Sequence, residues 1–246
     1  LWAIPLALLI ILIKPIYHIR LCRIHSERIG HFIFDSIQNI HLLINSPGTI
    51  LFSVGKNYSN RYWCKMLKRK IFISSSIDYL IRWMRYLPSG QHFILESTNT
   101  VSRDIYGQIQ NSDILLNFTD EENELGINYL KSKGWKKNDP FICILVRDDS
   151  YLKNNYKNKD WSYHNYRDTD INDYDLGVKW LIDQGVWVFR MGKIMKNKIT
   201  IKNKKYIDYA FDRDNKSDFL DIWMFSNADA CITTLSGLDQ LSWIYK

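Results

Sequence analysis

The feature that most constrains the fold is an unbroken run of six apolar residues, Phe141–Val146. Successive side chains of a strand point to opposite faces of its sheet, so this run predicts a strand that is covered on both faces. Two-sided burial is typical of parallel sheets with helices on each side. The run therefore favours an α/β protein over an antiparallel sheet with one face in water.

Strand-like and helix-like stretches alternate along most of the chain. Alternating or continuous apolar segments predict strands, and apolar residues at helical spacing predict helices. The predicted strands are residues 17–24, 49–54, 70–74, 141–146, 186–191 and 230–233. The predicted helices are residues 29–44, 77–87, 119–132, 171–183, 218–225 and one that begins at Ser236. Thr119 and Glu122 form a capping box that opens the helix of residues 119–132. This order predicts parallel sheets covered by helices.

The 246 residues are enough for one large domain or two small ones. Lys136–Pro140 is polar and rich in turn-forming residues, which marks a domain boundary. We therefore predict an amino-terminal domain of residues 17–136 and a carboxyl-terminal domain of residues 137–246. The chain begins with Leu1 and ends directly after an apolar stretch, so we expect a fragment whose carboxyl-terminal domain is incomplete.

The first 13 residues are almost purely apolar, and the first acidic residue of the sequence is Glu27. A bilayer span needs about 20 residues, and a signal peptide would carry its basic residues before the apolar run. Here Lys14 and Arg20 follow the run. Residues 1–16 are therefore predicted to be a membrane-inserted or interfacial segment. A buried core helix or strand is the alternative.

The formal net charge is +7, and residues 61–85 contain seven Lys or Arg residues but a single acid, Asp78. Such a basic patch suits anionic lipid headgroups or phosphate-bearing acceptors. An ordinary solvated basic face is the alternative. The excess charge is small and the chain has no recognisable nucleic-acid-binding module, so we expect no nucleic-acid partner.

Basic residues stand where two predicted strands end. Doubly wound sheets bind ligands at the carboxyl ends of their strands, and an Arg at a buried strand end needs an anionic partner. A shared diphosphate site could supply that partner, and for Arg147 the alternative is Asp148 or Asp170. The residues concerned are Arg147, Arg190, Gly192 and Lys193.

Two further strand ends carry candidate site residues. Thr234, Ser236 and Gly237 join a strand to a helix, where small hydroxyls and free amides bind phosphate, although Ser236 could simply cap the helix. Gly30 permits a tight turn after the first strand, and the imidazole of His31 beside it could take a proton from an acceptor hydroxyl. A surface histidine is the alternative.

Several familiar sequence motifs are missing. The chain contains no Gly-x-Gly-x-x-Gly, no P-loop and no Gly-x-Ser-x-Gly. Its nearest Asp-x-Asp pair, Asp168–Asp170, lies in the polar stretch of residues 148–170, which is predicted to be a long loop. The sequence therefore predicts neither a metal site nor a dinucleotide cofactor.

Several segments, taken in order, resemble a family of bacterial glycosyltransferases associated with surface-polysaccharide biosynthesis. They are residues 28–31, 141–152, 166–171, 188–193, 216–221 and 234–238. The resemblance implies a GT-B-like architecture of two Rossmann-like domains. It also implies that a nucleotide-diphosphate sugar binds mainly to the carboxyl-terminal domain, while a glycan or lipid-linked acceptor faces the amino-terminal one.

The resemblance implies metal-independent transfer without a cofactor, at the cytoplasmic face of the bacterial inner membrane. His31 would be the catalytic base, with Arg28 and Gly30 on the acceptor side. The base of the donor nucleotide is not implied. The implied donor-binding residues are Arg147, Tyr166, Arg167, Arg190, Gly192, Lys193, Thr234, Ser236 and Gly237.

Leu145 departs from the family, which tends to have a His at this position, two residues before Arg147. Ser150 likewise stands where distantly similar fucosyltransferases have an Asp. The alternative to an active transferase is therefore a catalytically inactive, membrane-associated polysaccharide assembly protein with the same fold.

Overall fold

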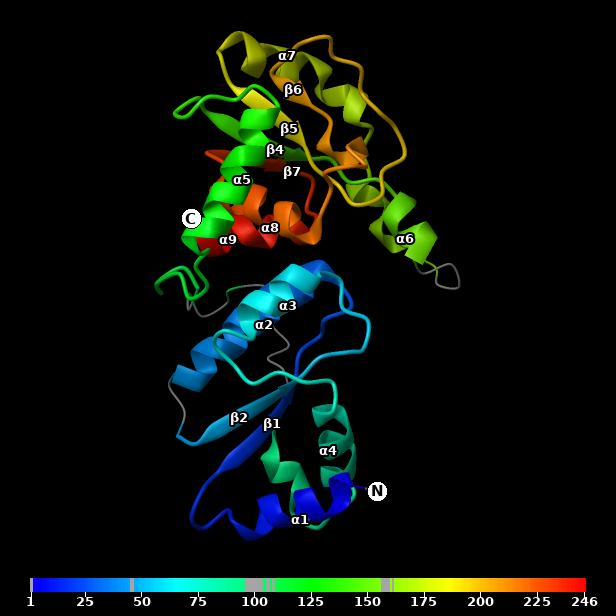
Figure 1. Cartoon of the computed structure of the whole chain (residues 1–246). Coiled ribbons are helices and arrows are strands. Elements are labelled where there is room, and N and C mark those ends of the chain that lie inside the picture. The colour runs from blue at the N-terminus through cyan, green and yellow to red at the C-terminus, as the bar shows by residue number, and fades with distance from the viewer. Residues whose placement is uncertain are drawn as a thin grey trace. The chain divides into compact units, whose positions relative to one another are not determined.

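A computed structural model describes residues 2–44, 47–95, 104, 107, 109–155, 160 and 162–246. The chain divides into two compact units, Leu1–Leu116 and Asn117–Lys246. Each unit is built from parallel strands with helices packed around them (Figure 1). The mixed α/β fold with parallel sheets, predicted from the alternation of segments, is therefore confirmed.

Unit 1 contains a three-stranded parallel sheet in the order β2-β1-β3. Its strands are β1 (Ile19–Arg23), β2 (Thr49–Ser53) and β3 (Ile94–Leu95). Its helices are α1 (Ala3–Leu12), α2 (Ile29–Ile44), α3 (Arg61–Leu67), α4 (Ile77–Met84) and the 3₁₀ helix η1 (Gly90–Phe93). The strand predicted over residues 70–74 is reduced to a bridge between Phe52 and Ile73, because the first of these residues bond to Leu67 in the turn after α3 and Phe72 and Ser74 bond to Phe52.

Helix α1 contributes one face to the core of unit 1. Its buried residues pack with α4 and neighbouring strands in one cluster. The cluster comprises Ala3, Ala7, Ile10, Leu21, Ile77, Leu80, Ile81, Met84 and Phe93. In the described part of the chain, no helix has the length and apolar character needed to cross a bilayer.

Unit 2 contains a four-stranded parallel sheet in the order β6-β5-β4-β7. Its strands are β4 (Phe141–Leu145), β5 (Trp187–Arg190), β6 (Tyr206–Ile207) and β7 (Ala230–Thr233). Its helices are α5 (Asp120–Ser132), α6 (Ser150–Asn155), α7 (Asp175–Asp183), α8 (Asp218–Asn227) and α9 (Gln240–Tyr245), with 3₁₀ turns η2 (Ser162–Arg167), η3 (Ile171–Tyr174), η4 (Tyr209–Phe211) and η5 (Gly237–Asp239). Every residue of β4 and β5 is buried, as the apolar run predicts.

Helix α5 begins with the predicted capping box. The Thr119 hydroxyl accepts a hydrogen bond from the Glu122 N–H at 3.3 Å, and the Glu122 carboxylate accepts one from the Thr119 N–H at 3.0 Å. The helix packs in unit 2, where a Cβ on Gly126 would lie 2.1 Å from the ring of Trp223 in α8. The boundary between the two compact units therefore falls after Leu116, not at residue 136. Caps and turns in a sequence show where a helix ends, but they do not show which core the helix joins.

The polar stretch of residues 148–170, predicted to be a long loop, contains α6 and η2. Strand β6 was missed, because two residues are too few to show a hydrophobic period. Residues 171–183 divide into η3 and α7 instead of forming one helix.

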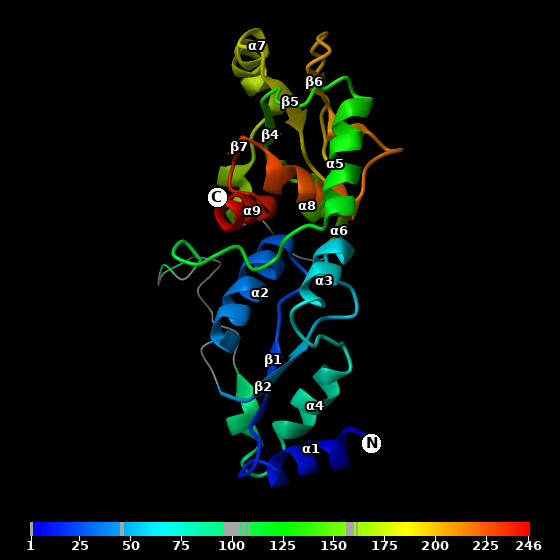
Figure 2. The ribbon, with the colours of Figure 1, turned by 60° about the vertical axis from the view of Figure 1, so that its left-hand side comes forward.

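The strand order of unit 2 identifies its ligand edge. β4 comes first in the chain and lies in the interior of the sheet (Figure 2), with β5 and β6 on one side and β7 on the other. The order of connection therefore reverses between β4 and β7. In open α/β sheets, ligands bind beyond the carboxyl ends of the strands at such a switch point.

Candidate functional site

The loops after β4 and β7 meet at this switch point. The Arg147 N–H donates a hydrogen bond to Thr234 Oγ1 at 2.9 Å. The Thr234 N–H in turn donates to the Leu145 carbonyl at 3.3 Å. The sequence predicted both Arg147 and Thr234 as site residues from separate segments, and the parallel pairing of β4 with β7 brings them together.

The Arg147 side chain is held by a carboxylate. Its Nε lies 3.1 Å from Asp168 Oδ1, and 13% of the side chain is exposed. Burial raises the pKa of Asp168, while the Arg147 charge opposes that rise. The acidic partner is thus Asp168, whereas the sequence analysis weighed Asp148 and Asp170.

Tyr166 and Arg167 lie beside the loop after β7. Arg167 Nη1 donates a hydrogen bond to the Leu235 carbonyl at 3.2 Å, and its Cζ lies 5.5 Å from the ring centre of the exposed Tyr166. Leu235 has a φ of 56°, a costly backbone conformation for a branched residue. Such strain collects at functional sites.

Ser236 does not act as a helix cap. It directly precedes η5, which begins at Gly237, but its side chain makes no capping hydrogen bond. Among the described residues, its buried Oγ has no hydrogen-bond partner. A buried hydroxyl without a partner is costly, so this oxygen is suited to a ligand at the switch point.

The loop after β5 adjoins the same edge. Gly192 has a φ of 146°, and a Cβ there would lie 2.4 Å from Met195 Sδ, so the turn requires glycine. Lys193 Nζ lies 3.1 Å from Asp218 Oδ1 in the first turn of α8. The Asp148 carboxylate accepts a hydrogen bond from the Lys196 N–H at 2.7 Å, which ties this loop to the loop after β4.

Arg190 is placed differently from the other predicted donor residues. Its side chain is only 1% exposed, and Nη1 lies 3.3 Å from Asp208 Oδ2. The same nitrogen donates to the Asn197 carbonyl, and the guanidinium lies 5.5 Å from the ring centre of Phe211. The structure therefore encloses Arg190 within unit 2 and does not bring it to the surface with Arg147.

The predicted acceptor-side residues lie in unit 1, at the start of α2. His31 Nδ1 is 3.4 Å from Oδ2 of Asp35, and His25 Nδ1 is 3.8 Å from the same oxygen. Asp35 is buried, so the two imidazoles provide its cationic partners when protonated. The sequence analysis missed Asp35, although its position four residues after His31 places both on one helix face.

Arg28 and Gly30 flank the start of the same helix. The Arg28 carbonyl accepts a hydrogen bond from the Phe32 N–H at 2.9 Å, so Arg28 begins the first turn. Gly30 is the second residue of α2. Gly30 therefore lies inside the helix and forms no tight turn before it.

Asp221 is a buried acid beneath the Lys193 loop. Burial raises its pKa from 3.8 to about 6, opposed by a hydrogen bond from Tyr209 and by the charges of Lys216 and Lys193. The Lys216 ammonium donates to the carbonyls of Lys193 and Ala210 at 2.7 and 2.9 Å. Lys216 and Asp221 thus support the corner between β5 and α8.

The raised pKa of Asp221 predicts that the protein loses stability as pH rises. The folded state binds this proton more tightly than the unfolded state, so the stabilisation is complete below about pH 4 and disappears above about pH 6. The loss is about 3 kcal/mol at most. Urea unfolding of the wild type and Asp221→Asn measures it, with the exposed Asp214→Asn as control. Equal pH dependence in all three proteins would contradict the assignment.

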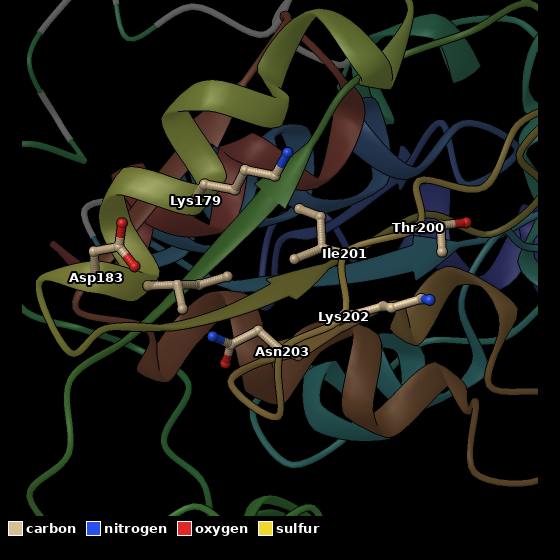
Figure 3. A pocket seen from close by; sticks show the side chains of 7 residues that line it. Lys179, Asp183, Thr200, Ile201, Lys202 and Asn203 are labelled. Atoms are coloured by element: carbon tan, nitrogen blue, oxygen red, sulfur yellow. The ribbon is translucent and has the colours of Figure 1, made fainter.

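A hollow of about 380 Å³ lies elsewhere in unit 2, between α7 and residues 200–203 (Figure 3). It is lined by Lys179, Ile182, Asp183, Thr200, Ile201, Lys202 and Asn203. None of these residues belongs to the predicted site, and none directly follows the last residue of a strand. Within the described ranges, no cluster of three or more His, Cys, Asp or Glu side chains is arranged to hold a metal ion.

Comparison of the sequence with family models and with curated proteins finds no match. Among solved structures, the chain is similar to the ADP-heptose LPS heptosyltransferase II of E. coli. The likeness has a TM-score of 0.50 at 12% identity, and it covers 92% of this chain and 82% of that chain. At this identity the likeness concerns the fold, which is thus similar to that of a glycosyltransferase.

Proposed function

We propose that this protein is a glycosyltransferase of bacterial surface-polysaccharide biosynthesis. It moves a sugar from a nucleotide-diphosphate donor to a glycan or lipid-linked acceptor. The observation that carries the proposal is the switch point between β4 and β7, where Arg147, Thr234 and Ser236 lie together. The fold likeness supports it, because the E. coli enzyme is named for a nucleotide-diphosphate sugar.

The donor binds at the carboxyl edge of the unit 2 sheet. The guanidinium of Arg147, the Ser236 hydroxyl and the amides of the loop after β7 hold the diphosphate. Lys193 and Arg167 add positive charge beside it. These groups stabilise the negative charge that grows on the leaving nucleoside diphosphate. No cofactor is required, and the exposed ring of Tyr166 is available for stacking on the donor.

The acceptor is activated by His31. The acceptor oxygen forms a bond to the anomeric carbon as the bond from that carbon to the diphosphate breaks. His31 takes the hydroxyl proton, and the nucleoside diphosphate leaves with the bonding electron pair. Asp35, at Nδ1, orients the ring so that Nε2 is the atom that accepts the proton.

We place this reaction at the cytoplasmic face of the inner membrane, where nucleotide sugars and lipid-linked acceptors meet. The large apolar residues exposed on α1 support this location.

Leu145 favours a second candidate, a catalytically inactive polysaccharide assembly protein with the same fold. It is buried at the end of β4, so no imidazole stands there to act on the donor. Turnover of a nucleotide sugar by the intact protein separates the two functions, since an assembly protein would bind partners without consuming donor.

Thermal unfolding in the presence of UDP, GDP, ADP or CMP tests the donor site. One nucleotide at 100 times its dissociation constant should stabilise the wild type by about 2.7 kcal/mol. Arg147→Ala should lose this gain, because the guanidinium that binds the diphosphate is removed. Arg213→Ala, an exposed change outside the site, serves as the matched control.

Selective stabilisation by one nucleoside diphosphate would also identify the base of the donor. If no nucleotide stabilises the folded wild type, the transferase proposal fails and the assembly protein becomes the better explanation. If a nucleotide stabilises the wild type and Arg147→Ala equally, the donor binds at a place other than the switch point.

A further inference from the structure

Helix α1 turns two alanines and Ile10 inward and most of its leucines outward. Ala3, Ala7 and Ile10 are buried in the core of unit 1, where the two alanines allow a close approach to α4. The outward side carries much larger apolar groups. The exposed members of this helix and its flanks are Trp2, Leu6, Leu8, Leu9, Leu12 and Ile16.

This outward side is contiguous and unusual for a surface in water. Leu6, Leu9 and Leu12 follow Trp2 at intervals of three or four residues, so they line one side of the helix. A helix that packs only against its own core would place polar residues there. Contiguous exposed apolar surface marks a place of interaction with a partner or a membrane.

Helix α4 extends this side with aromatic and basic side chains. The ring of Tyr79 lies 6.0 Å from that of Trp2, centre to centre. Arg82 follows Tyr79 by three residues on α4, so the two share a helix face, and Tyr86 comes two residues after the end of the helix. All are exposed, and neither Arg82 nor Arg85 has an ion-pair partner among the residues that the structure describes.

The basic patch predicted over residues 61–85 is divided by the fold. Helix α3, which carries Arg61 and Lys65, lies at the end of unit 1 opposite to α1 in both views (Figures 1 and 2). Arg82 and Arg85, on or just after α4, belong to the α1 side, since α4 packs against α1. Together with Lys14, they supply positive charge to a partner of α1.

We propose that the outward side of α1, with Tyr79, Arg82, Arg85 and Tyr86, docks on an anionic lipid bilayer. The helix lies in the interface with its leucines among the acyl chains, and it does not span the membrane. Tyr and Trp rings prefer the headgroup level, and the arginines pair with lipid phosphates. This complementary charge favours a bilayer over a second copy of the chain, which would oppose like charges. The proposal is independent of any transferase activity.

Vesicle co-sedimentation of the full chain tests this surface. Equal amounts of phosphatidylcholine and phosphatidylglycerol supply the anionic bilayer. The double variant Leu9→Gln/Leu12→Gln should bind at least about tenfold more weakly, because each leucine loses its transfer into the acyl region. The matched control is Leu125→Gln/Leu176→Gln, since Leu9 and Leu12 are 51% and 75% exposed and these leucines, on α5 and α7, are 60% and 81% exposed.

A second double variant tests the contribution of positive charge to bilayer binding. Arg82→Gln/Arg85→Gln should bind the anionic vesicles about tenfold more weakly and pure phosphatidylcholine as the wild type does. A wild-type protein that stays in the supernatant with anionic vesicles overturns the proposal. A particle mass that halves in Leu9→Gln/Leu12→Gln, without vesicle binding by the wild type, would show instead that α1 pairs two copies of the chain.

Discussion

Replacement of His31 by Ala should lower kcat for glycosyl transfer by about 10²–10⁴-fold, with little change in the KM for the donor. His31 faces a buried carboxylate at 3.4 Å, which suits a base whose ring is held in one orientation. The proposed donor site lies in unit 2, so the affinity for the donor should not depend on this side chain. Steady-state kinetics with nucleotide sugars that carry the base identified by thermal stabilisation measures both parameters.

Asp35→Asn tests whether Asp35 positions the His31 ring or only stabilises the fold. We expect kcat to fall at least about tenfold, because an amide no longer fixes the tautomer of His31. The ring ¹⁵N shifts of His31 should move toward a mixture of tautomers, which a purely structural role would not cause. His25→Gln is the control, since His25 lies farther from Asp35, at 3.8 Å, and is more exposed. Full activity in His31→Ala would show that another group is the base.

Asp208→Ala should destabilise the protein by about 3–5 kcal/mol. The change leaves the Arg190 guanidinium, 1% exposed, without the carboxylate that faces it at 3.3 Å. An uncompensated buried charge is far more costly than the loss of a surface pair. Urea unfolding measures the difference, and Asp175→Ala, which breaks the exposed pair with Lys179, should cost less than about 1 kcal/mol.

The double variant Arg190→Met/Asp208→Leu should recover most of this stability, because apolar groups of similar size remove both charges. It should also keep nucleotide binding, since Arg190 is enclosed within unit 2. If the double variant is stable but no longer stabilised by nucleotide, Arg190 binds the donor as the sequence suggested. If Asp208→Ala is as stable as the wild type, the pair does not hold β5 and β6 together.

Several parts of the fold could be read directly from the sequence. The run Phe141–Val146 predicted a strand buried on both faces, and β4 has that environment. The capping box at Thr119 and the helical spacing over residues 29–44 located the starts of α5 and α2. These signals are local, because each depends on residues a few positions apart whose geometry is set by the backbone period.

Arg147 and Arg190 show what such local signals do not predict. Both follow apolar strand residues, and the sequence treats them alike. Arg147 lies at the carboxyl edge of the sheet, where its N–H bonds to Thr234 after β7, while Arg190 is buried beside Asp208. Both placements depend on residues that are distant in the sequence. The division of α1 into an inward and an outward side has the same origin, since every residue from 2 to 13 is apolar. The sequence by itself therefore determined most of the elements and the kinds of chemistry available. The tertiary structure alone decided which side chains became exposed, because burial depends on packing partners that no local pattern specifies.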